Sequence, residues 1–332
     1  MKIGYLGTGA WGFCLASLLA RKGYELICWS IDKNQVEKLS QGLEHPMLKG
    51  HCPHGKMKFT TDLEEAVTNV DVIVESVTSK GLRPVCESIK DIRIPQCPFI
   101  ITSKGIEQNT GLILPEVTLD IFGEEARKLI GAISGPSFAK DTIEGLPTSV
   151  VGSGFNKDIM IKTCELFTSG TFRVYPNTDI LGVCYGGALK NIIAIACGIS
   201  GGLQLGNSCN AALMTRGLHE IRKLAVSKGC RPETLYGLSG MGDLCLTCGS
   251  IMSRNYKFGS LLAEGNSPDR AREIIGMVVE GAYTCVSALQ LSQELGVSMP
   301  ITEMVHKIVY ENFKASEAVE QLMQRAIKEE HL

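Results

Sequence analysis

The sequence carries no strong net charge, because 33 lysine and arginine residues are balanced by 35 aspartate and glutamate residues, for a formal charge of −2. This balance provides no general attraction to nucleic acid or to an anionic membrane, so we expect neither as a partner. The chain also lacks the low hydrophobicity of disordered proteins, since 44% of its residues are hydrophobic. At roughly 150 residues per domain, 332 residues predict two domains.

The thirteen cysteines form no recognisable disulfide framework. Their odd number and scattered positions in a long chain are typical of reduced thiols in the cytoplasm. Cys245 and Cys248 have the spacing of a metal or redox pair, but the chain has no second such pair. Because a structural zinc site needs four ligands, we expect no metal, while a redox role for the two thiols stays open.

Targeting and membrane-spanning segments are also lacking. The run Met1–Leu6 reaches glycine too soon for the apolar region of a signal peptide. The uncharged stretch 191–215 is apolar only to about Ser200, whereas a membrane helix needs roughly 20 mainly apolar residues. We therefore expect a buried core helix there, and a cytoplasmic protein without a membrane span.

What the first half does have is an alternation of short apolar runs with amphipathic stretches. The expected strands are Lys2–Leu6, Glu25–Trp29, Asp71–Ser76, Phe99–Thr102, Leu129–Ile133, Thr148–Val151 and Thr171–Val174. The expected helices between them are Ala10–Arg21, Lys33–Leu39, Leu63–Val67, Arg83–Lys90, Gly111–Ile121, Ser137–Thr142 and Asn156–Phe167. Alternating strands and helices predict a doubly wound, mainly parallel sheet of the Rossmann type.

The second half changes character after about Thr178. Long helical patterns follow one another without a clear strand, at Gly186–Ile199, Asn210–Lys228, Tyr256–Glu264, Ser267–Gly276, Thr284–Leu295 and Thr302–Lys314. We therefore predict an α/β chain with a dinucleotide-binding domain at 1–180 and an all-helical substrate domain at 181–332.

Glycine is abundant, with 36 residues, and three of them form a G-x-G-x-x-G motif: Gly7, Gly9 and Gly12. The motif directly follows an expected strand and opens an expected helix, which is the context of a dinucleotide-binding loop. Gly7 would permit the turn, Gly9 would admit a pyrophosphate, and Gly12 would let the helix approach the strand. Because no acidic residue ends the second strand, and Asp32 is followed by Lys33, we expect either NAD(H) or NADP(H).

Further motifs follow the glycine loop in a fixed order: Ser103–Glu107, Ser134–Lys140, Gly186–Asn191, Gly240–Leu244 with Leu246–Cys248, Ser253–Asn255, Val278–Gly281 and Met299–Thr302. Together they resemble the bacterial-type NAD(P)-dependent glycerol-3-phosphate dehydrogenases over residues 4 to about 304. The resemblance implies reversible reduction of dihydroxyacetone phosphate to sn-glycerol 3-phosphate, a precursor of phospholipids. It therefore implies these two phosphates as the small-molecule partners.

Three charged residues are candidates for the chemistry of this reduction. Lys190 lies among apolar residues, where burial lowers an ammonium pKa towards neutrality, and is the best candidate for the general acid. Asp243 is its expected partner, with Thr247 one turn further on, and Lys104 follows a strand end where ligands bind. The resemblance implies catalytic roles for all three. By pattern alone, a solvent-reaching lysine, a loop lysine and a helix-capping aspartate remain alternatives.

The resemblance also implies the binding residues. Substrate contacts are expected from Lys104, Gly135, Ser137, Lys190, Asp243, Ser253, Arg254 and Asn255, and cofactor contacts from Gly7, Gly9, Ala10, Trp11, Gly12, Lys104, Ala139, Arg254, Val278 and Glu280. An arginine with neighbouring amide and hydroxyl donors suits phosphate oxygens. The chain departs from the family at Ala10, often serine, and at Ile31, often basic or histidine.

Two other functions fit part of the pattern. A related β-hydroxyacid dehydrogenase would share the glycine loop and a helix-borne lysine but act on a carboxylate. A nucleotide-binding redox sensor would bind NADH without using the lysines. The apolar helical half is compatible with a homodimer, although nothing in the sequence measures the oligomeric state.

Overall fold

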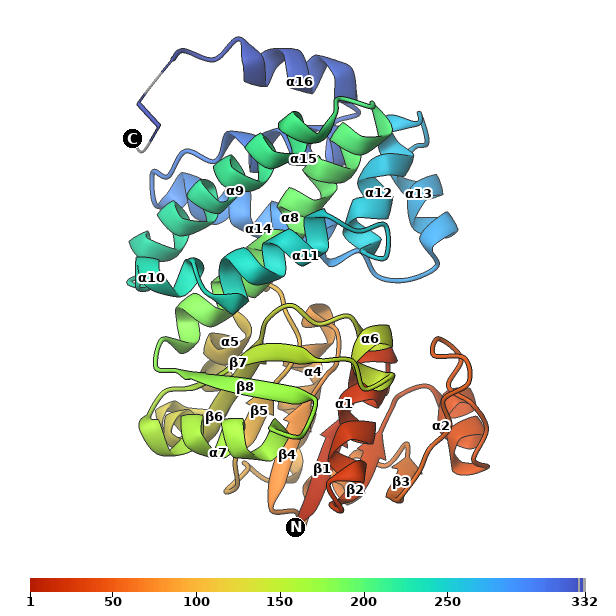
Figure 1. Ribbon diagram of the computed structural model, residues 1–332. Helices are drawn as coiled ribbons and strands as arrows, with labels where there is room; N and C mark the ends of the chain where they lie inside the picture. Colours follow the sequence, from red (N-terminus) through yellow and green to blue (C-terminus); the bar gives the residue numbers. More distant parts are fainter. Residues whose placement is uncertain (328, 331–332) are drawn as a thin grey trace. The chain divides into compact units, whose positions relative to one another are not determined.

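The computed structural model describes residues 1–327 and 329–330, which form two compact units. The first unit comprises Met1–Ser103 and Leu114–Ile180. The second comprises Lys104–Ile113 and the chain from Leu181 onward. Figure 1 colours the chain along its length and shows the sheet of the first unit and the helices of the second. The segment Lys104–Ile113 belongs with the helices because Ile106 and Ile113 are buried in their apolar core.

The first unit contains an eight-stranded sheet with the order β3-β2-β1-β4-β5-β6-β7-β8. The strands are β1 (Lys2–Leu6), β2 (Glu25–Trp29), β3 (Lys56–Thr60), β4 (Val72–Glu75), β5 (Phe99–Ile101), β6 (Ile130–Ser134), β7 (Thr148–Gly154) and β8 (Phe172–Asn177). All neighbouring strands are parallel except β6 and β7. The mainly parallel sheet predicted from the sequence is therefore confirmed.

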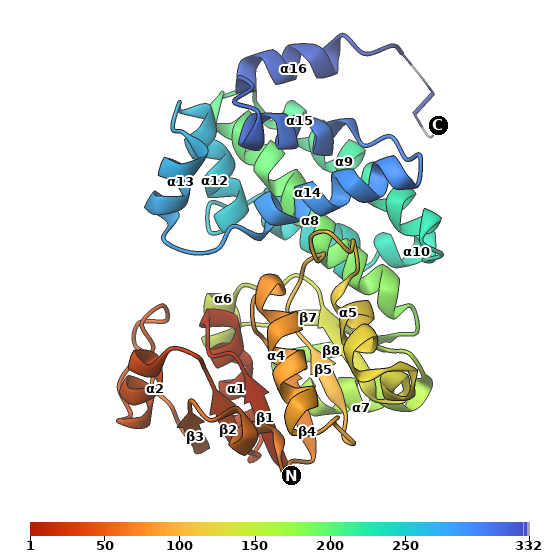
Figure 2. The same cartoon turned by 180° about the vertical axis from the view of Figure 1, so that it is seen from behind.

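Helices cover both faces of this sheet, as Figures 1 and 2 show from opposite sides. They are α1 (Ala10–Arg21), α2 (Lys33–Ser40), α3 (Leu63–Val67), α4 (Ser79–Ile92), α5 (Leu114–Phe122), α6 (Ala139–Ile143) and α7 (Lys157–Phe167). In these views α1 and α7 lie on one face, and α4 and α5 on the other. The order of the strands reverses at β1, so the crevice between β1 and β4 is where such sheets bind ligands.

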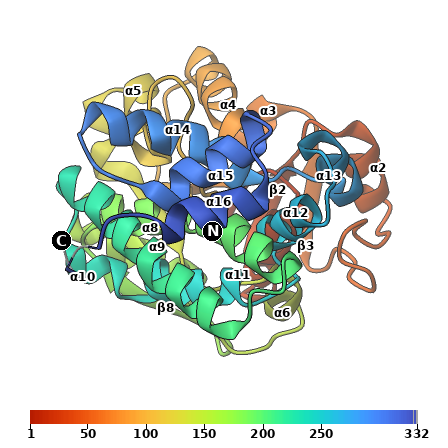
Figure 3. The ribbon, with the colours of Figure 1, turned by 90° about the horizontal axis from the view of Figure 1, so that it is seen from above.

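The second unit is helical in the part that the structure describes. Its helices are α8 (Ile180–Gly202), α9 (Asn207–Ser227), α10 (Pro232–Leu235), α11 (Asp243–Cys248), α12 (Arg254–Ala263), α13 (Pro268–Ile275), α14 (Glu280–Glu294), α15 (Pro300–Tyr310) and α16 (Ala315–Met323). A single π-helical turn, Leu238–Gly242, precedes α11. Figure 3 views α9, α15 and α16 from above. Among the described helices only α8 is long and apolar enough to cross a membrane, and 89% of its most apolar window is buried within the fold.

Candidate active site

The glycine loop between β1 and α1 depends on the absence of side chains at two positions. Gly7 has φ +95°, and a Cβ there would lie 2.7 Å from the Ser76 carbonyl oxygen. A Cβ on Gly12 would lie 2.1 Å from the Gly7 carbonyl oxygen. At Gly9, by contrast, the space beyond the Cα is open, and α1 begins at the next residue. An open approach to a helix N-terminus is what a pyrophosphate requires.

A buried polar network, which the sequence pattern does not predict, fixes this loop. The Thr8 hydroxyl donates to Gln35 Oε1 at 2.8 Å, and Gln35 Nε2 donates to the Thr8 carbonyl at 2.9 Å. The His45 ring, fully buried and stacked on Phe13, lies 2.9 Å from the same carbonyl. These partners come from 27 and 37 residues away, so no local motif identifies them.

The second unit brings the chemical residues together by close backbone packing. A Cβ on Gly186 of α8 would lie 2.7 Å from the Ser239 carbonyl oxygen. A Cβ on Gly240 would lie 2.0 Å from the Leu235 carbonyl oxygen. The π-helical turn therefore packs against α8 without intervening side chains, and Asp243, the first residue of α11, reaches the middle of α8.

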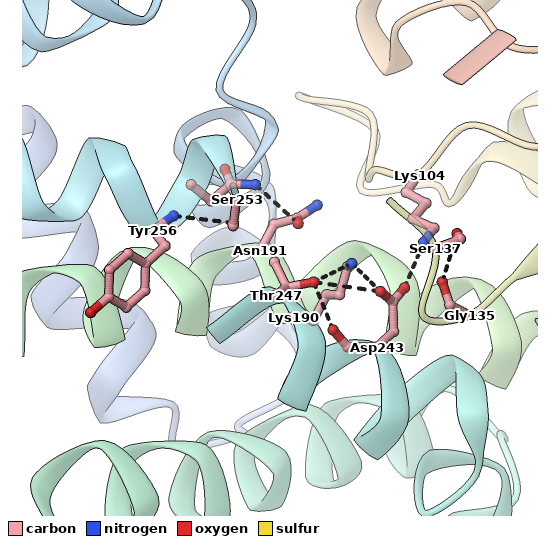
Figure 4. Close-up of polar contacts among 10 residues, drawn as sticks. Lys104, Gly135, Ser137, Lys190, Asn191, Asp243, Thr247, Ser253 and Tyr256 are labelled. Atoms are coloured by element: carbon pink, nitrogen blue, oxygen red, sulfur yellow. Dashed lines mark hydrogen bonds and ion pairs between the residues drawn. The ribbon is translucent and has the colours of Figure 1, made fainter. Parts of the chain in front are cut away.

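Asp243 lies between the two lysines, as Figure 4 shows. Lys190 Nζ donates to Asp243 Oδ1 and, at 2.6 Å, to the Thr247 hydroxyl. Lys104 Nζ donates to Asp243 Oδ2 at 2.5 Å. The Asp243 side chain is 1% exposed, that of Lys190 8%, and that of Lys104 20%. The sequence pattern predicted that Lys190, Asp243 and Thr247 lie together, and in the structure Lys190 contacts both Asp243 and Thr247.

The environment adjusts the acidity of Lys190. Burial lowers the pKa of its ammonium to about 8, although the negative charge of Asp243 acts in the opposite direction. The positive charge of Lys104 lowers this pKa further. An ammonium with a pKa near 8 is both protonated and a usable proton donor at neutral pH.

Two asparagines connect α8, α12 and α14. Asn255 Nδ2 donates to Asn191 Oδ1 at 3.0 Å, and Asn255 Oδ1 accepts from the Gly281 N–H at 2.9 Å. The family resemblance implies that Asn255 contacts the substrate. Part of its hydrogen-bonding capacity is nevertheless used within the protein. Ser253 caps α12 by accepting the Tyr256 N–H at 3.2 Å. Asn191 was missed as a partner because it lies 64 positions away.

The remaining predicted residues fall into two groups. Arg254 and Val278 lie together in the second unit, where the guanidinium donates to the Val278 carbonyl at 3.0 Å. Partial burial lowers the pKa of Arg254, and the negative charge of Glu280 opposes that change. Gly135, Ser137 and Ala139 lie in the first unit with the glycine loop. Gly135 has φ +152° and accepts the Ser137 hydroxyl at 3.1 Å.

No group of three or more histidine, cysteine, aspartate or glutamate residues in the described chain lies close enough to hold a metal. Cys245 is exposed and Cys248 is buried. A hydrogen bond with Cys197 that favours the neutral thiol, together with burial, raises the pKa of Cys248 well above its ordinary value. A thiol of raised pKa is a poor nucleophile, and this one packs as part of the core.

Comparison with known proteins agrees with this geometry. Residues 2–159 match the model of the NAD-dependent glycerol-3-phosphate dehydrogenase N-terminus, and residues 179–320 match that of the C-terminus. The chain is 62% identical over 331 residues to the glycerol-3-phosphate dehydrogenase [NAD(P)+] of Protochlamydia amoebophila, covering 100% of this chain and 99% of that protein. It is 52% identical over 330 residues to the protein of the same name from Chlamydia pneumoniae, covering 99% of each.

Solved structures agree as well. The crystal structure of glycerol-3-phosphate dehydrogenase from Coxiella burnetii has a TM-score of 0.93 at 35% identity, covering 98% of this chain and 99% of that chain. A D-mandelate dehydrogenase structure, with a TM-score of 0.63 at 13% identity, shares the fold alone. The chain belongs to the family of NAD-dependent glycerol-3-phosphate dehydrogenases and is an oxidoreductase with a Rossmann-type NAD(P)-binding domain.

Proposed function

We propose that this protein catalyses the reversible NAD(P)H-dependent reduction of dihydroxyacetone phosphate to sn-glycerol 3-phosphate, which supplies phospholipid synthesis. The observation that carries the proposal is the buried Lys190–Asp243–Lys104 group within segments that match the family. A ketone reduction needs a positioned proton donor, and this group provides one with a pKa suited to neutral pH.

Lys190 donates the proton to the ketone oxygen in this proposal. The Asp243 carboxylate holds the ammonium in place and favours its charged form, while Thr247 accepts a second N–H. A second ammonium, on Lys104, polarises the carbonyl towards the negative charge that develops on its oxygen. In the reverse direction the neutral Lys190 amine accepts the hydroxyl proton.

The cofactor is held by the glycine loop. Gly7, Gly9, Ala10, Trp11 and Gly12 supply backbone contacts at the start of α1, where the open space at Gly9 fits a pyrophosphate. The reduced nicotinamide, when bound, supplies the hydride. Lys104, Ala139, Arg254, Val278 and Glu280 complete the cofactor contacts implied by the family.

The substrate phosphate requires cationic and hydrogen-bonding groups. Arg254 and Asn255, with Ser253 beside them and with Gly135 and Ser137, are the residues we assign to the substrate besides the lysines and Asp243. The guanidinium of Arg254 is exposed and offers further N–H donors beyond the one used by Val278.

We also propose a domain organisation, a cellular location and an oligomeric state. The functional domains are the dinucleotide-binding domain at 1–180 and the helical substrate domain at 181–332, with Lys104 contributed by the segment Lys104–Ile113. The protein works in the cytoplasm. It forms a homodimer through its helical half, which equilibrium sedimentation would test.

The direct test measures oxidation of NADH and of NADPH with dihydroxyacetone phosphate, compared with β-keto acids of similar size. We expect turnover with the phosphate and little with the acids. Turnover only with a keto acid would assign the lysines to a β-hydroxyacid dehydrogenase. Cofactor binding without oxidation by any three-carbon phosphate would instead indicate a nucleotide sensor. The ratio of the NADH and NADPH rates gives the cofactor preference.

A further inference from the structure

A fully buried carboxylate stands at the carboxyl end of the sheet, outside the residues discussed so far. Glu75 is the last residue of β4 and has no exposed surface. It pairs with Leu6 of β1 on one side and with Ile101 of β5 on the other. One of these neighbouring strands leads into the glycine loop, and the other leads to Lys104.

The Glu75 carboxylate holds the residue that precedes Lys104. The Ser103 hydroxyl lies 2.9 and 2.7 Å from the two carboxylate oxygens, and the Val77 N–H donates to one of them at 2.6 Å. The Thr102 hydroxyl donates to the Glu75 main-chain carbonyl at 2.8 Å. Both residues that follow β5 are thus attached to the end of β4.

The largest influences on the Glu75 charge are burial and hydrogen bonds from the neutral groups of Ser103, Val77 and Thr102. Burial raises the pKa of the carboxyl to about 7, although the hydrogen bonds from Ser103 and Val77 oppose that change. The Glu75 charge also acts on Tyr5 of β1 and Cys86 of α4, which are neutral near pH 7 because burial raises the pKa of each. A buried carboxylate costs folding free energy that an apolar side chain would not. The contact between Glu75 and Ser103, the residue before Lys104, points to a functional reason.

The chain passes from one unit to the other at this attachment. The first segment of the first unit ends at Ser103, and the second unit begins at Lys104. The Lys104 ammonium bonds to Asp243, so the position of the Lys104 backbone affects the group that protonates the substrate. We propose that Glu75 is a positioning residue, whose carboxylate fixes Ser103 and thereby places Lys104 against Asp243.

This inference rests on the proposed function and predicts a specific pH dependence. The ionised carboxylate accepts both hydrogen bonds, whereas the protonated acid loses acceptor capacity and loosens its hold on Ser103. The rate should therefore rise with pH through about 7, as Glu75 ionises. It should then fall through about 8, as Lys190 loses its proton.

The experiment compares Ser103→Ala, Glu75→Gln and the double variant in the full-length protein. We expect kcat/KM for dihydroxyacetone phosphate to fall roughly tenfold in each single variant, since small misplacements of reacting groups are costly. The double variant should lose no more than the worse single variant, because both remove one interaction. Glu75→Gln should also lose the acid limb of the pH profile, while the NADH dissociation constant changes less than kcat/KM does, because the glycine loop is untouched.

The matched control is Glu220→Gln, which alters another buried glutamate of raised pKa, one that accepts hydrogen bonds from Ile301 and Thr302. It should leave kcat and KM unchanged. Wild-type kinetics in Ser103→Ala would overturn the inference, even where Glu75→Gln fails to fold. Additive losses of kcat/KM in the double variant would also overturn it, and so would a loss of NADH binding without a loss of kcat. A wild-type protein that binds NADH but does not oxidise it with dihydroxyacetone phosphate contradicts the proposed function instead.

Discussion

Replacing Asp243 by asparagine tests how the protein adjusts its proton donor. The substitution keeps the size of the side chain but removes the only negative charge that contacts Lys190 in the described chain. The ammonium is then buried beside the positive Lys104 without a counter-ion. We therefore expect the pKa of Lys190 to fall below its value of about 8.

The size of the effect follows from the loss of a contacting opposite charge, which changes a pKa by roughly two pH units. At pH 7.5 the protonated fraction of Lys190 would fall from roughly three quarters to roughly one thirtieth, about a 25-fold loss of rate. Misplacement of the two lysines adds to this loss. Lowering the pH should restore part of the activity, because it protonates the lysine again.

The assay follows NADH oxidation with dihydroxyacetone phosphate between pH 5.5 and 9. The wild type should lose activity above about pH 8, whereas Asp243→Asn should lose it about two pH units lower. Asp120→Asn is the matched control, since Asp120 is half exposed and its ion pair with Arg83 is a surface pair of little energetic value. An Asp243→Asn variant with wild-type rate and an unchanged alkaline inflection would refute the reasoning.

Three other substitutions test separate parts of the account. Lys104→Met removes a charge that lowers the pKa of Lys190, so the alkaline inflection of kcat should move to higher pH, and an unmoved inflection would count against the coupling. Gly12→Ala places a Cβ 2.1 Å from the Gly7 carbonyl and should weaken NADH binding, measured by fluorescence titration, whereas Gly170→Ala, where the added Cβ meets nothing, should not. Glu220→Gln should flatten the pH dependence of stability measured by urea unfolding. Burial raises the pKa of Glu220 to about 7, so this residue stabilises the folded protein at pH values below the pKa it has in the unfolded chain. About 3 kcal/mol of that stability is lost as the pH rises through 7. Equal pH slopes in the wild type and the variant would contradict this.

The sequence predicted those features that depend on local pattern. The strand–glycine–helix order identified the loop at Gly7, and the apolar setting of Lys190 identified a buried lysine. The strand Lys56–Thr60 was missed because it lies at the edge of the sheet and buries few side chains, so its sequence lacks a continuous apolar run. The helix expected from Gly111 begins instead at Leu114, because Gly111 has φ +67° and its segment packs with the helical unit.

Contacts between distant residues were beyond reach of the pattern. Nothing near Thr8 indicates Gln35 and His45, and nothing near Ser103 indicates Glu75. One signal was available for Glu75, since an acidic residue at the end of the apolar run Val72–Val74 is unusual for a buried strand. Without the register of β4 against β5, that residue could not be assigned a partner.

The central claim is that Lys190 donates the proton to the ketone oxygen. It is tested most directly by a single-turnover measurement of Lys190→Ala, in which excess enzyme holding less than one equivalent of NADH is mixed with excess dihydroxyacetone phosphate. We expect an NADH dissociation constant close to that of the wild type and a rate of NADH oxidation lower by roughly 10²–10⁴-fold, the contribution of a general acid. A single-turnover rate equal to that of the wild type would remove Lys190 from the mechanism.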